Sequence, residues 1–290
     1  MKFESVNPET VNKLYKPTKL QTVLDEFMRS DALAATTQQS SVWATRLRPV
    51  SSMGICTSSK SVLPRRRPQM NIPDTIVKAA AQSHLNEVVT KAYTPSLLLV
   101  GSHSSPFLRS VKRLAQEVGM DAHILSYLPP LIGDCKVVVD RETCDTVAHL
   151  PAEADVDNLY NPGTSCVAEA AFEFLFDAVA LEGKTVTIVG RGHAVKGLAE
   201  KLLGLNATVT VAHSHTKDLY KAMNGQDVVI LATPVVPAFP LANEMVLDIG
   251  GTLPKEMIEQ LPPGCQYEGR IGKLTNSILL VRAAGVYHEI

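Results

Sequence analysis

Short apolar runs alternate with amphipathic segments from about residue 74 to the end of the chain. Runs of β-branched and aliphatic residues predict buried strands, and longer segments with apolar positions at helical spacing predict helices. The expected strands cover residues 96–100, 123–125, 136–139, 185–189, 208–211, 228–232 and 245–249. The expected helices cover residues 75–92, 106–118, 165–181, 194–205 and 274–284. Strands that alternate with helices predict an α/β fold with parallel sheets covered on both faces.

The first 73 residues have a different pattern. Apolar positions at helical spacing predict a short helix within residues 1–31, whereas residues 32–73 contain no Asp or Glu and are rich in Ser, Thr and Arg. Such a composition cannot bury enough apolar surface to fold alone, so we expect a poorly structured extension over residues 1–73. Three interpretations stay open: a mitochondrial transit segment, a basic arm that binds a protein or RNA partner, and a solvated extension.

Composition narrows the class of protein. The chain has 290 residues, is 45% apolar and carries a formal net charge of −1, which predicts no general affinity for nucleic acid or anionic membranes. No apolar run is long enough to span a bilayer. The five cysteines are an odd number without a C-x-x-C pair, which argues against a disulfide framework and against a metal site. A reducing compartment follows, and we expect a mitochondrial location, with the cytoplasm as the alternative.

A glycine-rich turn, Gly190-Arg191-Gly192, separates an expected strand from the helix that follows it. Backbone N–H groups at such a turn, aided by the helix dipole, bind phosphate, so this unit predicts a dinucleotide site. The third glycine of the G-x-G-x-x-G fingerprint is replaced by Val195. A strand–helix–strand unit that binds no ligand is therefore the simpler alternative.

The end of the next strand indicates which dinucleotide would bind. An NAD site needs an acidic residue about 20 residues after the turn, to hold the ribose hydroxyls. His213 and Ser214 stand there instead, so no carboxylate repels a 2′-phosphate, and Arg191 can pair with one. NADP is therefore predicted over NAD. The candidate cofactor-binding residues are Gly190, Arg191, Gly192, His213 and Ser214.

Residues 190–216, GRGHAVKGLAEKLLGLNATVTVAHSHT, resemble the signature of the bifunctional methylenetetrahydrofolate dehydrogenase/cyclohydrolase (FolD-like) family. That signature reads G-R-S-x-x-V-G-x-P, then a helix ending in L-L, then A-T-V-T and H-S-x-T. Upstream, the D-V-D at 155–157 resembles the family's D-V-D-G, and downstream, residues 247–250 resemble its I-D-V-G. The resemblance extends over about residues 75–285.

The resemblance implies a two-domain architecture with NADP in the second domain. It places a smaller folate-type catalytic domain at 74–160, a Rossmann domain at 161–272, and a C-terminal helix at 273–290 that packs back on the first domain. It also implies a homodimer through the dinucleotide domain. Members of the family oxidise 5,10-methylenetetrahydrofolate by hydride transfer and then hydrolyse the methenyl product.

The positions that carry the family's chemistry are altered in this chain. The resemblance implies a Tyr and a Lys on the helix after the first strand, where Phe107 and Val111 stand, and neither replacement can transfer a proton. Asp157 is the one catalytic remnant, and a lone carboxylate in a loop is more often a cap or turn residue. In the cofactor turn, Gly192 replaces Ser and Lys196 replaces Gly, and whether the Lys196 ammonium crowds or binds a phosphate is open.

We therefore expect a catalytically impaired relative of this family that acts as a structural or regulatory subunit of a larger assembly. Its partners would be proteins that contact the N-terminal extension, and RNA contact rests only on the short run Arg65-Arg66-Arg67. The alternative is an active NADP-dependent methylenetetrahydrofolate dehydrogenase with a rearranged site. A basic group beside Asp157 would favour that alternative.

Overall fold

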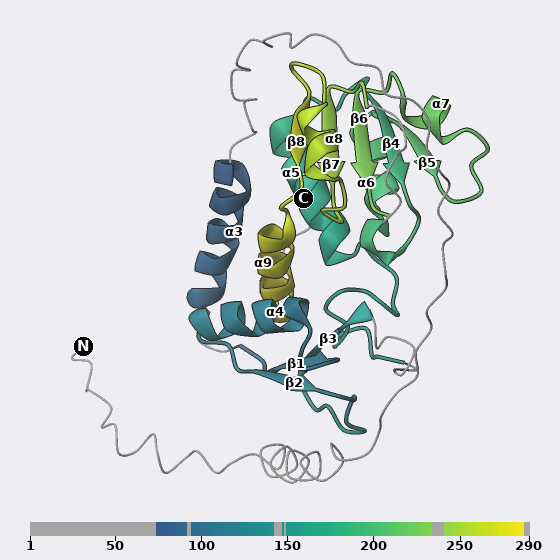
Figure 1. The fold of residues 1–290 in the computed structure, drawn as a ribbon. Coiled ribbons are helices and arrows are strands. Elements are labelled where there is room, and N and C mark those ends of the chain that lie inside the picture. The colour runs from purple at the N-terminus through teal and green to yellow at the C-terminus, as the bar shows by residue number, and fades with distance from the viewer. Residues whose placement is uncertain (1–73, 92–93, 142–146, 148, 234–240, 287–290) are drawn as a thin grey trace, which may run out of the picture. The chain divides into compact units, whose positions relative to one another are not determined.

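The computed structural model describes residues 74–91, 94–141, 147, 149–233 and 241–286. Its described part contains two parallel sheets with helices packed against them (Figure 1). The extension at 1–73 and the helix expected within 1–31 lie outside the described residues. The predicted α/β class is confirmed, including the Rossmann-like parallel sheet. None of the described helices is long and apolar enough to cross a membrane.

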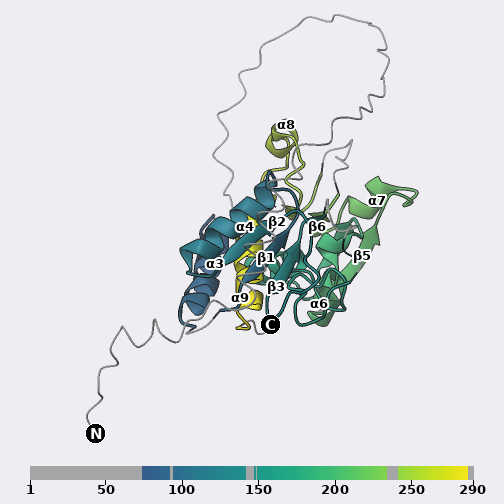
Figure 2. The same ribbon diagram turned by 90° about the horizontal axis from the view of Figure 1, so that it is seen from below.

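The first sheet has three parallel strands in the order β2-β1-β3. Its strands are β1 (Leu97–Val100), β2 (Ala122–Leu125) and β3 (Lys136–Val139). All four residues of the apolar run in β1 are buried, as expected of a central parallel strand. Helices α3 (Asp74–Val89) and α4 (Pro106–Glu117) belong to this part of the chain and lie beside it in Figure 2.

The second sheet has five parallel strands in the order β5-β4-β6-β7-β8. These strands are β4 (Thr185–Val189), β5 (Thr208–Ala212), β6 (Val228–Leu231), β7 (Met245–Asp248) and β8 (Gln266–Glu268). Strand β5, expected to be buried, is an edge strand with mostly exposed residues, and the Val211 residue is 45% exposed. That expectation was wrong because an apolar run does not reveal whether a strand has one neighbour or two.

The helix expected at 194–205 is divided. A one-turn 3₁₀ helix, η2 (His193–Val195), comes first, and α6 (Leu198–Gly204) follows it. Gly197 lies between them with φ +83°, a left-handed conformation that ends one helix before the next begins. Because the helix is divided, the backbone dipoles behind the glycine turn do not add up over one long helix.

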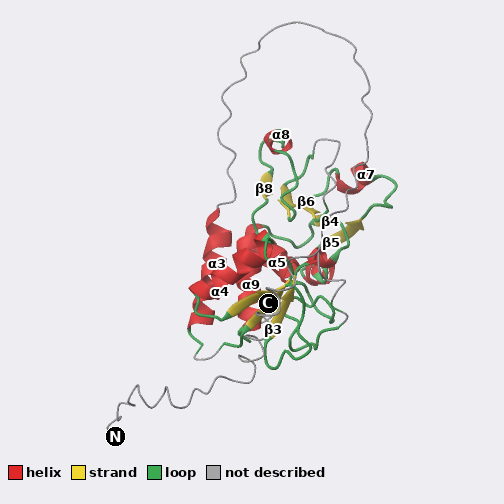
Figure 3. Cartoon of the chain, turned by 60° about the horizontal axis from the view of Figure 1, so that its bottom comes forward, coloured by secondary structure: helices red, strands yellow, loops and turns green. Residues whose placement is uncertain are grey.

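Two helices connect the sheets. Helix α5 (Cys166–Ala178) packs against α6, and α9 (Gly272–Ala283) packs against α3, α4 and α5. One buried core cluster accordingly contains residues of both sheets, whose strands form separate yellow groups in Figure 3. The short helices α7 (Leu219–Met223) and α8 (Lys255–Glu259), which the apolar pattern did not predict, pack on the second core cluster.

A buried ionic cluster fastens α5 to its neighbours. The Glu169 carboxylate on α5 is fully buried and accepts from Lys201 Nζ of α6 at 2.9 Å and from Arg282 Nη2 of α9 at 3.4 Å. Arg282 also donates to the carbonyl of Thr164 at 2.8 Å, just before α5. A buried carboxylate needs such partners, so this cluster holds α6 and α9 in place on α5.

Candidate functional site

The glycine turn begins at the carboxyl end of β4, which is the central strand between β5 and β6. Gly190 has φ +123°, and a Cβ added there would lie 2.9 Å from the carbonyl oxygen of Ala232 at the end of β6. Its N–H donates to the carbonyl of Ala212 at the end of β5, at 2.8 Å. Glycine is therefore required at 190 both by its backbone conformation and by the closeness of the neighbouring strand.

A cavity of about 510 Å³ opens where β4, β5 and β6 end. The five residues predicted to bind cofactor all line it, together with Arg141, which follows β3 of the first sheet. None of the described residues that line it is acidic. The lining residues are Arg141, Val189, Gly190, Arg191, Gly192, His213, Ser214, Leu219, Ala232 and Thr233. Two guanidinium groups around a cavity at strand ends suit a ligand that carries phosphate.

The H-S-x-T motif forms a tight turn at the end of β5. The His213 N–H donates to Oγ1 of Thr216 at 2.9 Å, and the Thr216 N–H donates to the His213 carbonyl at 2.8 Å. The His215 N–H donates to Nδ1 of His213 at 3.2 Å, which leaves Nε2 as the protonated nitrogen of a neutral ring. These bonds hold the imidazole and the neighbouring Ser214 at the cavity wall.

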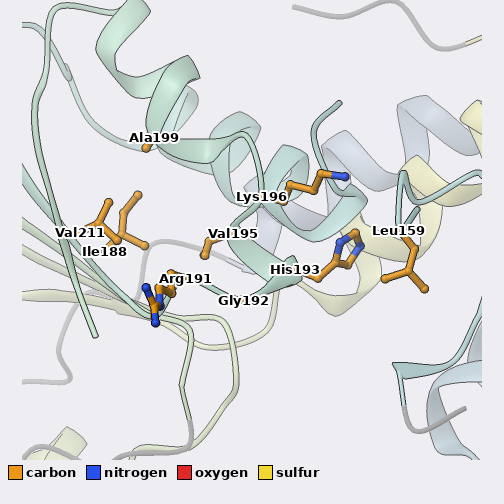
Figure 4. A pocket seen from close by; sticks show the side chains of 10 residues that line it. Leu159, Ile188, Arg191, Gly192, His193, Val195, Lys196, Ala199 and Val211 are labelled. Carbon is orange, nitrogen blue, oxygen red and sulfur yellow. The ribbon is translucent and has the colours of Figure 1, made fainter. Parts of the chain in front are cut away.

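A second cavity, of about 450 Å³, lies along the other side of the glycine turn (Figure 4). His193 and Lys196 extend toward Leu159 there, whereas Arg191 lies at the opposite end of the turn. Leu159 belongs to the loop that follows the D-V-D motif. This cavity therefore brings the cofactor turn and the D-V-D loop together.

Asp157 is held by two hydrogen bonds rather than facing open solvent. Its Oδ1 accepts from the backbone N–H of Cys166 at 2.6 Å, at the first turn of α5, and its Oδ2 accepts from Nε2 of His193 at 2.8 Å. The first bond is the capping role expected of a lone carboxylate, because a helix start offers unpaired N–H groups. The second bond places a basic side chain beside Asp157. Burial raises the pKa of the Cys166 thiol well above its usual value, so that group stays neutral.

The Lys196 ammonium does not extend into the cavity at the strand ends. Its Nζ donates to the carbonyl oxygens of Asn158 at 2.6 Å and Asn161 at 2.5 Å. Asp155 shapes the same loop, because its carboxylate accepts from the backbone N–H groups of Leu159, Tyr160 and Asn161. Lys196 therefore fixes the loop and is not available to a phosphate in this arrangement.

Phe107 and Val111, which the resemblance assigns to the family's Tyr and Lys positions, lie on α4. Val111 is fully buried in the core between α4 and its neighbours, and Phe107 packs against the same core. Among the described residues, no hydrogen bond or ion pair joins Lys112 or Arg113 to Asp157, and Arg113 pairs instead with Glu117 at 3.8 Å on the surface. No group of three or more metal-binding side chains occurs in the described part of the chain.

Two residues of this region were not singled out as site residues from the sequence. His193 lies inside the glycine-turn motif, so the motif itself was a usable signal. Arg141 follows β3 without any motif, and only the fold brings it to the glycine turn. The Asp157–His193 contact could not be read from spacing, since the two residues belong to separate loops.

The chain is similar in sequence to known proteins. Residues 165–253 match the family model described as the tetrahydrofolate dehydrogenase/cyclohydrolase NAD(P)-binding domain. The bifunctional protein FolD of Thermotoga petrophila is 28% identical over 263 residues, which cover 72% of this chain and 96% of the relative.

Solved structures share the fold. The bifunctional enzyme FolD of Campylobacter jejuni aligns with a TM-score of 0.55 at 19% identity, over 73% of this chain and 96% of its own. The methylenetetrahydrofolate dehydrogenase-cyclohydrolase of Trypanosoma brucei, solved with NADP and an inhibitor, aligns with a TM-score of 0.55 at 22% identity. That alignment covers 72% of this chain and 93% of the trypanosome protein.

Proposed function

Because this chain is a divergent member of the FolD-like methylenetetrahydrofolate dehydrogenase/cyclohydrolase family, we propose that it binds NADP but is impaired in the family's catalysis. The observation that carries the proposal is the burial of Val111, which stands where the resemblance assigns the family's Lys. A titratable amine at this position would handle protons, whereas an aliphatic side chain in the core cannot.

The cavity at the ends of β4, β5 and β6 fits NADP. His213 and Ser214 lie at the end of β5, where the ribose of a dinucleotide is read, and Arg191 lies in the adjacent turn after β4. The described lining contains no carboxylate that would repel a 2′-phosphate. The glycine turn allows the backbone to approach the pyrophosphate. When bound, NADP would supply hydride-transfer chemistry, and the residues of this chain would hold and orient it.

Asp157 supports the second candidate, an active NADP-dependent methylenetetrahydrofolate dehydrogenase with a rearranged site. His193 lies 2.8 Å from this carboxylate, and their side chains are 17% and 18% exposed. A partly buried imidazole oriented by a carboxylate can move a proton, so the pair could replace the lost lysine. The other oxygen of Asp157 accepts from the Cys166 N–H at the start of α5, so this carboxylate also has a structural role. We place impaired catalysis first because the side chain at 111 is a buried valine and not an amine.

One experiment separates these proposals. The full chain is titrated with NADP, with NAD as the control, and is then assayed for methylenetetrahydrofolate-dependent reduction of NADP. We expect NADP binding with turnover well below about 1 per second, the lower end of ordinary enzyme rates. Turnover at that rate or above would contradict the impairment and favour the active dehydrogenase. Failure to bind NADP would contradict the cofactor site itself.

A structural or regulatory role in a larger assembly, through the extension at 1–73, is part of the proposal and rests on sequence alone. So does the mitochondrial location. Both the partner role and the location are tested by deleting residues 1–73 from the tagged protein. The two forms are then compared by microscopy and by affinity purification from cells of the source organism. An unchanged location and unchanged co-purifying proteins would contradict them.

A further inference from the structure

Arg141 approaches the glycine turn from the other sheet. A Cβ added to Gly192 would lie 3.1 Å from Nη2 and 3.4 Å from Nη1 of this arginine. Both terminal nitrogens of the guanidinium therefore lie close to the space that a side chain at 192 would occupy. Arg141 also lines the 510 Å³ cavity together with Arg191.

The backbone does not explain why residue 192 is glycine. Gly192 has φ −77° and ψ 179°, a conformation that any residue adopts without strain. The neighbour that a side chain at this position would meet is the guanidinium of Arg141. The family pattern has Ser at this position, which would offer one hydroxyl donor to a ligand at the turn. In this chain the space that the serine side chain would occupy adjoins the Arg141 guanidinium, which carries several N–H donors.

The divided helix gives the turn less dipole potential than one long helix would. A long helix that starts at a glycine turn adds its dipole to phosphate binding. In this chain the turn is followed by the three-residue η2 and then, after Gly197, by the seven-residue α6. A doubly ionised pyrophosphate at the turn therefore gains less from helix dipoles, and the guanidinium beside Gly192 can supply further positive charge.

We propose that Arg141 binds the pyrophosphate of the dinucleotide across the glycine turn, in place of the donor that a serine at 192 would supply. This inference rests on the proposed NADP site. Arg191 and Ser214 remain the residues predicted to pair with the 2′-phosphate. Ser214 stands at the end of β5, where the ribose is read, whereas the Arg141 guanidinium lies beside Gly192 in the turn after β4. Arg141, which follows a strand of the first sheet, thereby helps to bind a cofactor whose other predicted ligands follow strands of the second sheet.

The test measures the binding of two ligands to the wild-type full chain and to four variants of it. The variants are Arg141→Ala, Arg113→Ala, Gly192→Ser and the double variant Arg141→Ala/Gly192→Ser. NADP carries both the pyrophosphate and the 2′-phosphate, whereas adenosine 2′-monophosphate carries only the latter. We expect Arg141→Ala to raise the Kd for NADP by about 10- to 100-fold, the effect of losing a charge-assisted hydrogen bond. It should leave the Kd for adenosine 2′-monophosphate within about twofold, a difference that is not significant on this energy scale. Arg113→Ala removes a surface guanidinium of α4 and should change neither value.

Gly192→Ser provides a readout that a general loss of structure would not move. In the wild-type background the new side chain meets the Arg141 guanidinium, and we expect weaker NADP binding. In the Arg141→Ala background the space is free and the serine hydroxyl is a new donor, so the same substitution should strengthen binding. This change of sign is a coupling between the two positions.

Several results would overturn the inference. NADP binding by Arg141→Ala within about twofold of the wild type, or additive effects of the two substitutions, would do so while the proposed NADP site stands. Equal loss of both ligands would place Arg141 at the 2′-phosphate instead. If the wild-type chain does not bind NADP, the proposed function fails together with the inference.

Discussion

Nε2 of His193 lies 2.8 Å from Oδ2 of Asp157, and this bond joins the glycine turn of the second sheet to the D-V-D loop. Because an ionised carboxylate can only accept, the imidazole is the donor. The other oxygen of Asp157 accepts from the N–H of Cys166 at 2.6 Å. One carboxylate therefore caps α5 and orients an imidazole at the same time.

Substitution of Asp157 tests the capping role. We expect Asp157→Ala to lower the free energy of unfolding by about 2 kcal/mol, because the N–H of the fully buried Cys166 loses its acceptor. His193→Ala should cost about 1 kcal/mol, since only one hydrogen bond is lost. Denaturant unfolding measures both. The matched control is Glu153→Ala, which removes an exposed carboxylate from the same segment. A loss in the control as large as that in Asp157→Ala would contradict the assignment.

A lysine at position 111, where the resemblance places the family's lysine, should destabilise the protein. Val111 is 0% exposed, and Val111→Lys would place an ammonium in the aliphatic core. We expect the free energy of unfolding to fall by about 3 kcal/mol or more. Gln116→Lys introduces the same residue at an exposed position of α4 and should change stability by less than about 0.5 kcal/mol. Thermal unfolding compares the two. If Val111→Lys were as stable as the wild type, the placement of position 111 in the aliphatic core would be contradicted.

His84 on α3 gives the stability a pH dependence. Burial lowers its pKa, but the hydrogen bond and charge of Glu173 on α5, with the charge of Glu87, outweigh this, and the pKa is raised. Nε2 of His84 lies 3.0 Å from both carboxylate oxygens of Glu173. A raised pKa means that the folded state holds the proton more tightly, so the stabilisation is complete below about pH 6.5 and disappears as the pH rises through the folded-state pKa.

The comparison of wild type with His84→Gln measures this effect. We expect the difference in free energy of unfolding to be larger at pH 6 than at pH 8 by on the order of 1 kcal/mol. His123→Gln is the control, since His123 lies beside the largely exposed Asp121 and its contact is screened by solvent. A difference that grows with pH would have the wrong sign and would contradict the assignment.

Gly197 separates η2 from α6 for a steric reason. It has φ +83°, and a Cβ there would lie 2.5 Å from Oγ1 and 2.9 Å from Cα of Thr164. We expect Gly197→Ala to lower the free energy of unfolding by about 2 kcal/mol or more, because both the backbone and the packing oppose it. Gly204→Ala lies in α6 with nothing within 4 Å and should be neutral or stabilising by up to about 1 kcal/mol. Chemical denaturation measures the free energy of unfolding of both variants. Equal effects of Gly197→Ala and Gly204→Ala would refute the steric explanation.

The apolar pattern predicted the strands well, because a buried run of aliphatic residues depends on its own composition. The expected bounds of β3 and β4 agree with the observed ones, Lys136–Val139 and Thr185–Val189. The break within 194–205 was not predicted, because Gly197 is placed against Thr164, which lies far upstream in the sequence. Likewise, the exposure of β5 depends on its position at the edge of the described sheet.

The candidate site was predictable to the extent that it is local. The glycine turn and the H-S-x-T turn lie at the ends of adjacent strands, so residues of both motifs line one cavity. The role of Lys196 was left open from the sequence, because its partners, the carbonyl groups of Asn158 and Asn161, belong to another loop. The role of Arg141 could not be predicted from the sequence, because this residue belongs to no motif and only the fold brings it to the turn.

The Lys196 ammonium links the glycine-turn segment to the loop after the D-V-D motif, because it donates to two carbonyl groups of that loop. A nucleotide bound at the turn after β4 would therefore also reduce local opening in residues 158–161, which it does not contact. We expect amide hydrogens in residues 158–161 to exchange more slowly when NADP is added, and Lys196→Met should abolish that protection while leaving exchange in β7 unchanged. Lys196 would in this way couple the D-V-D loop to the occupancy of the cavity at the glycine turn.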